Sequence, residues 1–101
     1  MMIALEEAVM EIIVNAGQSR SLCFEALHAA RQGNLDEAKS LLREADGYAQ
    51  QAHKMQTKLI EQDAGEARQP MTLIMVHAQD HLMNSLLARE LSEEIIHLYQ
   101  R

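Results

Sequence analysis

The chain has 101 residues and a net charge of −6, because 9 Lys and Arg residues stand against 15 Asp and Glu residues. This acidic balance and an aromatic content of 3% argue against a nucleic-acid binder, which needs clustered basic residues and rings for base stacking. Good helix formers dominate, and one Pro and four Gly leave few turns. We therefore expect one all-α domain over residues 1–101, not a β-sandwich or barrel.

The cellular compartment follows from cysteine usage and hydropathy. A single Cys excludes an internal disulfide and fits a reducing cytoplasm. No apolar run approaches the roughly 18 residues of a membrane-spanning helix, and the N-terminus lacks the basic start of a signal peptide. We expect a cytoplasmic protein with no membrane insertion.

Two short segments interrupt the helical pattern. Gly33 and Asn34 form the first, and Asn34 is a good N-cap because Glu37 follows three residues later. In the second, Gly65 is a typical helix stop and Pro70 suits the first turn of the next helix. The breaks predict three helices, at roughly 3–32, 35–63 and 70–100. Short connections predict an antiparallel up-down-up three-helix bundle.

The first two predicted helices each carry one apolar stripe at helical spacing. In the first helix, Gly17 lowers helix propensity and indicates either a close helix approach or a bend. Cys23 lies on that stripe and is interpreted as a packing residue. The first stripe comprises Leu5, Val9, Ile12, Ile13, Ala16, Cys23, Leu27 and Ala30, and the second comprises Leu35, Ala38, Leu42, Ala45, Ala49, Ala52, Met55 and Leu59.

The third predicted helix is apolar on two sides over residues 71–87. At about 100° per residue, one line follows Leu73, His77, Asn84, Ala88, Leu91 and Ile95, and the opposite side carries Met75, Leu82, Met83 and Leu86. After Ala88 the helix becomes amphipathic, with Arg89, Glu90, Glu93, Glu94 and His97 expected on the outer side. A three-helix bundle buries one stripe per helix, so we expect the second face to be covered by another copy of the chain. The interface is expected along the first half of this helix.

Four polar residues share one face of the third helix: His77, Asp80, His81 and Asn84, at i, i+3, i+4 and i+7. They interrupt an apolar line, and burial of an unpaired carboxylate or imidazole costs several kcal/mol. The face is therefore either a satisfied structural network or a histidine site tuned by a nearby carboxylate.

Several chemistries compete for these residues. A zinc hydrolase would use the i,i+4 pair His77 and His81, but the position after His77 is Ala78, where the zincin signature has Glu. A hydrolase based on Cys23 has less support. The two E-x-x-H motifs typical of di-iron proteins are predicted to point to solvent, and a fourth helix is absent; they are Glu25 with His28 and Glu94 with His97.

A phosphoryl carrier fits the pattern better. A neutral imidazole is a competent nucleophile for in-line phosphoryl transfer and is regenerated when the group moves on. Such a carrier needs one accessible ring nitrogen, neighbours that fix the tautomer, and donors for phosphoryl oxygens. His77, with polar neighbours on a rigid helix, meets this description.

The sequence also resembles a known family over nearly its whole length. The run MTLIMVHAQDHLMNSLLARELSEEII (Met71 to Ile96), preceded by QTKLIEQDAGEA (Gln56 to Ala67), resembles the enzyme IIA component of the lactose/chitobiose/cellobiose phosphotransferase family. The segment NAGQSRSLCFEALHAARQGNLDEAKSLL is similar to the first helix and turn of that family, and VHAQDHLM is the most specific match.

The resemblance implies a homotrimer of three-helix bundles that accepts a phosphoryl group from phospho-HPr and passes it to a cysteine of the IIB component during sugar uptake. By resemblance, His77 is the phosphorylated histidine, reacting at Nε2, and His81 helps to position the phosphoryl group. Asp80 corresponds to the aspartate that meets its symmetry mates at the trimer axis, where a divalent cation such as Mg²⁺ binds. Gln79 matches the motif but is expected to point away from His77.

A non-catalytic helical adaptor is the alternative function. Its partner would cover the second apolar face of the third helix, as a trimer would. The adaptor interpretation gives no reason for His77, Asp80 and His81 within that face, and therefore explains less of the sequence.

Overall fold

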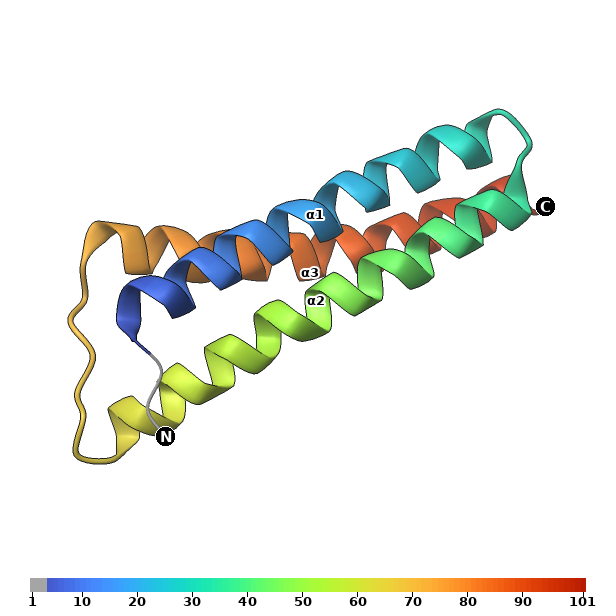
Figure 1. The fold of residues 1–101 in the computed structure, drawn as a ribbon. Coiled ribbons are helices and arrows are strands. Elements are labelled where there is room, and N and C mark those ends of the chain that lie inside the picture. The colour runs from blue at the N-terminus through green and yellow to red at the C-terminus, as the bar shows by residue number, and fades with distance from the viewer. Residues whose placement is uncertain (1–3) are drawn as a thin grey trace.

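The computed structural model describes residues 4–101, which form three α-helices in an up-down-up bundle (Figure 1). The helices are α1 (Leu5–Arg31), α2 (Leu35–Ala64) and α3 (Leu73–Tyr99). The bundle is elongated, with extents of 51 × 23 × 18 Å. The all-α antiparallel prediction is confirmed, although the expected start of the first helix at residue 3 lies outside the described residues. Among residues 4–101, no helix has the length and apolar character needed to cross a membrane.

The turn between α1 and α2 is stabilised from the α1 side. Gly33 has a φ of 87°, a left-handed conformation that favours glycine. The backbone N–H of Gly33 donates to the carbonyl of Ala30 at 3.0 Å, and that of Asn34 donates to Ala29 at 2.9 Å, which is a Schellman motif. Asn34 is the N-cap residue of α2, as expected, but its side chain makes no capping hydrogen bond. The capping-box prediction is wrong because the ψ of Asn34 is 69°, not the extended value of a capping residue.

The connection between α2 and α3 differs from the sequence prediction at its end. α2 is capped at Gly65, as expected. α3, however, begins at Leu73, because the Thr72 side chain caps it by accepting a hydrogen bond from the Met75 N–H at 3.3 Å. Pro70 therefore precedes the helix instead of forming its first turn. The segment is tied to α2 by Asp63, whose Oδ1 accepts a hydrogen bond from the Gln69 N–H at 2.7 Å.

Small residues line the contacts between the helices. Most predicted stripe positions of α1 and α2 are buried, which confirms the two stripes; buried apolar residues of these helices include Ala8, Val9, Ile12, Ala16, Cys23, Ala26, Ala38, Leu42, Ala45, Ala49, Ala52 and Leu59. Alanine-rich surfaces leave little room between helices, so one stripe per helix fills the core. Cys23 is fully buried, and burial raises the pKa of its thiol, in agreement with its interpretation as a packing residue.

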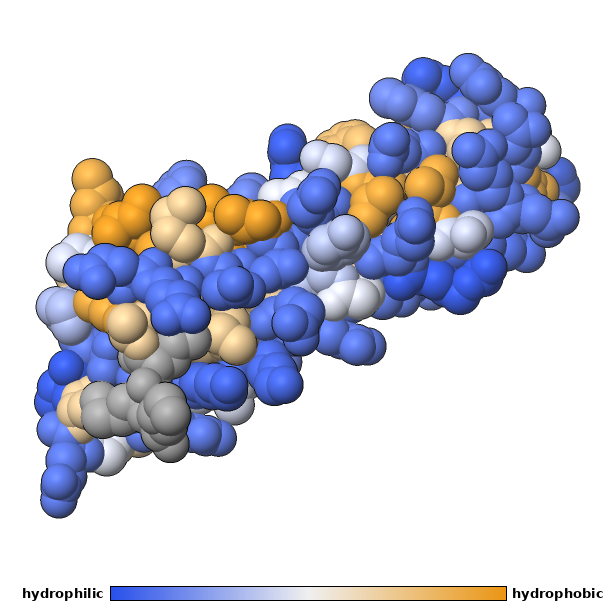
Figure 2. Space-filling model, in the orientation of Figure 1, coloured by the Kyte–Doolittle hydropathy of each residue, from blue (hydrophilic) through white to orange (hydrophobic). Residues whose placement is uncertain are grey.

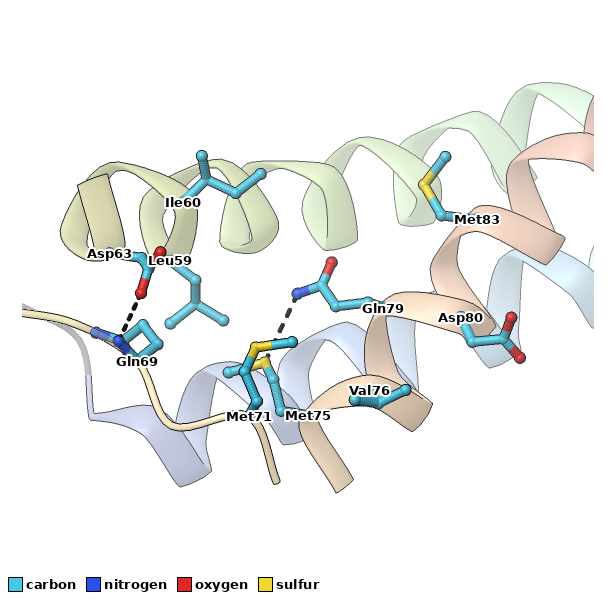
Figure 3. A pocket seen from close by; sticks show the side chains of 10 residues that line it. All are labelled: Leu59, Ile60, Asp63, Gln69, Met71, Met75, Val76, Gln79, Asp80 and Met83. Carbon is cyan, nitrogen blue, oxygen red and sulfur yellow. Dashed lines mark hydrogen bonds between the residues drawn. The ribbon is translucent and has the colours of Figure 1, made fainter. Parts of the chain in front are cut away.

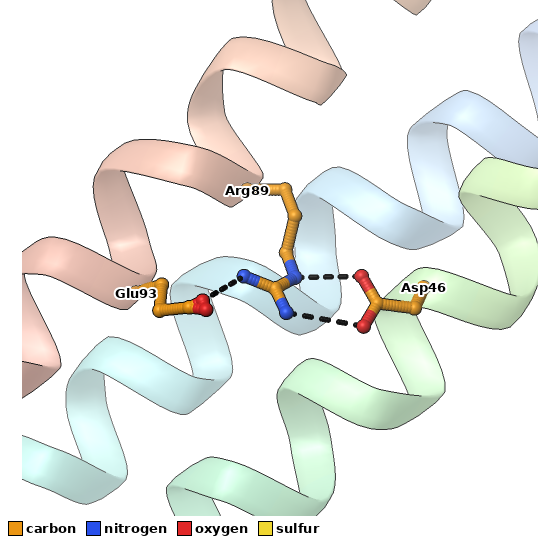
Figure 4. A network of polar contacts seen from close by, with 3 residues as sticks. All are labelled: Asp46, Arg89 and Glu93. Atoms are coloured by element: carbon orange, nitrogen blue, oxygen red, sulfur yellow. Dashed lines mark hydrogen bonds and ion pairs between the residues drawn. The ribbon is translucent and has the colours of Figure 1, made fainter.

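The buried stripe of α3 passes through Met75, Ala78, Leu82, Ser85, Ser92 and Ile96. After Ala88 this stripe continues through Ser92 and Ile96, and Arg89 extends it toward α2. The Nε of Arg89 donates to Asp46 Oδ1 at 2.6 Å, its Nη2 donates to Asp46 Oδ2 at 3.1 Å, and its Nη1 donates to Glu93 Oε2 at 3.3 Å (Figure 4). The expected outward position of Arg89 is wrong, because the bidentate pairing with Asp46 holds the guanidinium across the α2–α3 contact; the Glu93 side chain is 41% exposed.

Substitutions at two glycines test this description of the backbone. Gly47 lies within α2, and a Cβ added there would meet no atom within 4 Å. We expect Gly47→Ala to raise the free energy of unfolding by about 1 kcal/mol, since glycine is unfavourable inside a helix. Gly33→Ala should lower it by about 1 kcal/mol or more, because alanine is strained at positive φ. Urea denaturation at one fixed chain concentration measures both, and a stabilising Gly33→Ala would contradict the turn geometry.

Candidate functional site

The outward face of α3 carries exposed leucines from the first turn of the helix to the last. Exposed fractions are 86% for Leu73, 54% for Leu87, 53% for Leu91 and 61% for Leu98. These residues recur at the heptad spacing of a helix that packs against other helices in a coiled coil. Figure 2 shows hydrophobic side chains gathered over the end of the bundle where α3 begins. The uncovered face was expected over the first half of the helix only, but it continues to Leu98.

The four predicted polar residues interrupt this exposed face. His77, Asp80 and Asn84 are exposed, whereas His81 is half-buried. Asn84 Nδ2 donates to Asp80 Oδ2 at 3.3 Å, so the amide is oriented by the carboxylate. Their common face is confirmed. Asp80 is solvated within one chain, however, and the expected burial of its carboxylate would require a second chain to cover it.

The two histidines lie parallel, one helical turn apart. Their ring centroids are 5.9 Å apart, with an interplanar angle of 13°. His81 also lies against α1, because a Cβ added to Gly17 would be 3.5 Å from His81 Nε2. α1 runs unbroken through Gly17, and the His81 ring lies at ordinary contact distance from the place of its Cβ, so no unusually close approach of two helices requires glycine there. His77 is thus the more accessible imidazole of the pair.

A cleft of about 440 Å³ lies between α2 and α3, whereas His81 faces α1. Its wall is mainly apolar and includes Ile60, Met71 and Met83, and Asp80 lies at its edge (Figure 3). Gln79 points into this cleft toward α2 (Figure 3), and two residues along a helix from His77 its side chain lies on another side of α3, as expected. Its Oε1 accepts a hydrogen bond from Gln56 Nε2 at 2.5 Å, a tie between α2 and α3 that sequence reasoning missed.

The competing metal chemistries find no support in residues 4–101. No group of three or more His, Cys, Asp or Glu side chains among these residues could hold a metal ion. The four residues of the two E-x-x-H motifs are all exposed, as predicted; they are Glu25, His28, Glu94 and His97. The buried thiol of Cys23 is likewise inaccessible to a substrate.

The described face therefore presents one exposed imidazole with a second imidazole parallel to it and a carboxylate–amide pair beside it. An exposed ring nitrogen can attack an electrophile that another protein brings to it. The parallel ring of His81 and the amide of Asn84 supply hydrogen-bond donors for anionic oxygens. Helical spacing predicted this grouping, but only the fold brings Gly17 and Gln56 to its two sides.

Comparison with known proteins identifies the chain. A family described as "PTS system, Lactose/Cellobiose specific IIA subunit" matches residues 7–100. The N,N'-diacetylchitobiose-specific EIIA component of Escherichia coli is 50% identical over 97 residues, covering 96% of this chain and 84% of that protein.

Solved structures agree with this match. The crystal structure of the cellobiose-specific enzyme IIA from Bacillus anthracis has a TM-score of 0.93 at 38% identity, over 99% of this chain and 92% of that chain. The IIA(Chitobiose)–HPr complex of the Escherichia coli phosphotransferase system has a TM-score of 0.84 at 49% identity, over 97% of this chain and 95% of that chain. The chain therefore belongs to the lactose/cellobiose-specific IIA subunit family and is a phosphocarrier component of a sugar phosphotransferase system.

Proposed function

We propose that this IIA subunit carries its phosphoryl group on His77, accepting it from phospho-HPr and passing it to a cysteine of a IIB component. The observation that carries the assignment is the difference between the two histidines of the face. His77 is exposed, while His81 is half-buried against α1. In-line transfer between two proteins requires an imidazole that the donor can reach, which favours His77.

The proposed reaction conserves the imidazole. The neutral Nε2 of His77 attacks phosphorus, and the bond between phosphorus and HPr breaks as the P–N bond forms. In the second step the IIB thiolate attacks the same phosphorus as the P–N bond breaks, and His77 leaves as a neutral imidazole that keeps its proton on Nδ1. His81 lies with its ring centroid 5.9 Å from that of His77, where an N–H of its ring can orient a phosphoryl oxygen.

We further propose that three chains pack through the exposed face of α3 to form a homotrimer. The heptad-spaced leucines of this face would be buried, and Asp80 would converge with two copies of itself. Three carboxylates at one axis repel, and their oxygen atoms suit a hard divalent cation such as Mg²⁺. One chain supplies a single carboxylate, so Asp80 could hold such an ion only together with its two symmetry mates.

The transported sugar is proposed from the relatives. They include proteins named for N,N'-diacetylchitobiose, lactose and cellobiose, so a disaccharide of this class is the proposed cargo of the system. The HPr partner is supported by the complex of a relative 49% identical to this chain. A cytoplasmic location belongs to the same proposal and is consistent with an unpaired cysteine. Family membership supports this carrier over a non-catalytic adaptor.

Phosphorylation of His77 is tested by intact-mass spectrometry after incubation with phosphoenolpyruvate, enzyme I and HPr. Wild type should gain one phosphoryl group per chain at neutral pH and lose it in acid, as a phosphoramidate does. His77→Ala should gain none, whereas His81→Ala should still be labelled, at a rate lowered about tenfold or more because the phosphoryl group is less well oriented.

The variants separate two ways in which this assignment could fail. Unlabelled wild type would remove the carrier role altogether. Label that persists in His77→Ala but disappears in His81→Ala would place the phosphoryl group on His81, one turn along the helix. His53→Ala is the matched control, because His53 is an exposed histidine on α2, away from the face.

Assembly is tested by Asp80→Leu in sedimentation equilibrium. This substitution removes the proposed cluster of like charges, so the trimer should persist. It should dissociate only at chain concentrations at least about tenfold below those at which wild type dissociates. Glu90→Leu, the same change at an exposed acid outside the heptad line, should leave assembly unchanged. Leu87→Asp should dissociate the trimer. A monomeric Asp80→Leu would contradict the axial assignment.

A further inference from the structure

Glycine at position 17 is unfavourable for the stability of the helix that contains it. α1 runs without interruption from Leu5 to Arg31, and glycine inside a helix is less favourable than alanine. Its φ is not positive, so the backbone does not require glycine. Its one close neighbour outside the local helix is the imidazole of His81, 3.5 Å from the place of a Cβ.

The ring of His81 is held by packing alone. Among residues 4–101, it makes no hydrogen bond or ion pair, and its one ring contact is with His77. A histidine that acts on a reacting group is commonly oriented by a hydrogen bond from a second residue. Here the ring of His81 contacts α1 at Gly17 through its Nε2 and is stacked with the ring of His77, and these two contacts restrict where the ring can be.

We infer that Gly17 is a positioning residue for phosphoryl transfer, acting through His81. The small size of this residue lets the His81 imidazole lie against α1, and this contact sets the ring relative to His77. A Cβ at 3.5 Å is an ordinary van der Waals contact, so alanine fits. A β-branched side chain adds two γ carbons with little rotational freedom, and these would displace the ring. The inference rests on the proposed role of His77.

The test compares Gly17→Val with Gly47→Val, using the rate of phosphoryl transfer from phospho-HPr to the chain. Both substitutions place valine inside a helix, but at Gly47 the added Cβ meets open space. Gly17→Val should slow the transfer about tenfold to a hundredfold, the effect of misplacing a group by about 1 Å. Gly47→Val and Gly17→Ala should remain within about twofold of wild type. Circular dichroism and sedimentation check that all three variants are folded and assembled.

A double variant decides whether the effect passes through His81. In a His81→Ala background, Gly17→Val should change the transfer rate by less than about twofold, because the ring that it displaces is absent. Transfer at the wild-type rate in folded Gly17→Val would overturn the inference. A slowing equally large with and without His81 would also overturn it, since that result indicates a general packing defect.

The NMR signals of the His81 ring provide a readout that is independent of phosphoryl transfer. They should shift in Gly17→Val and remain unchanged in Gly47→Val. If wild type accepts no phosphoryl group, the proposed function fails, yet these signals still report whether Gly17 sets the ring. A different outcome would refute the positioning role alone. In it, wild type is phosphorylated and Gly17→Val is slowed, but the His81 ring signals of Gly17→Val are not shifted.

Discussion

The rest of the structure depends on the fact that α3 is apolar on two opposite faces while a three-helix bundle buries only one. The face with Met75, Leu82 and Ile96 fills the core against α1 and α2. The face with Leu73, Leu87 and Leu91 is left in solvent by a single chain. Exposure of so many large apolar side chains along one line is unfavourable, and the proposed association of copies through that line would remove it from water.

This constraint also explains why the polar residues stand out. His77, Asp80 and Asn84 lie on the uncovered line, where leucines would pack better if packing were the sole requirement. Their place on a helix fixed by two packed neighbours gives the imidazole a rigid support. In the proposed trimer the same residues would be costly for assembly and useful for chemistry, which is the pattern expected of a functional site within an interface.

Periodicity predicted much of the fold because the stripes of α1 and α2 are narrow and consist of Ala, Leu and Ile at helical spacing. The start of α3 was misplaced at Pro70, because Thr72 caps this helix and the connection before it is tied to α2 through Asp63. Periodicity also misplaced Arg89. The buried stripe of α3 continues there through Ser92, and a partner on α2, Asp46, attracts the guanidinium.

Part of the site was also predictable from helical spacing. Spacing along one helix is enough to place His77, Asp80 and His81 on one face, whereas their separate roles came from the family resemblance. Contacts between helices could not be read from spacing. Gly17 was noticeable as a weak helix former, but its contact with His81 depends on how α1 and α3 align. The tie between Gln56 and Gln79 depends likewise on the distance between α2 and α3.

The central claim is that the uncovered face of α3 serves both to assemble three chains and to carry the phosphoryl group. Native mass spectrometry of the chain after incubation with phosphoenolpyruvate, enzyme I and HPr tests both parts together. The account predicts a particle of three chains, each of 11.4 kDa, carrying up to three phosphoryl groups. A phosphorylated single chain, or a trimer that gains no phosphoryl group, would contradict it.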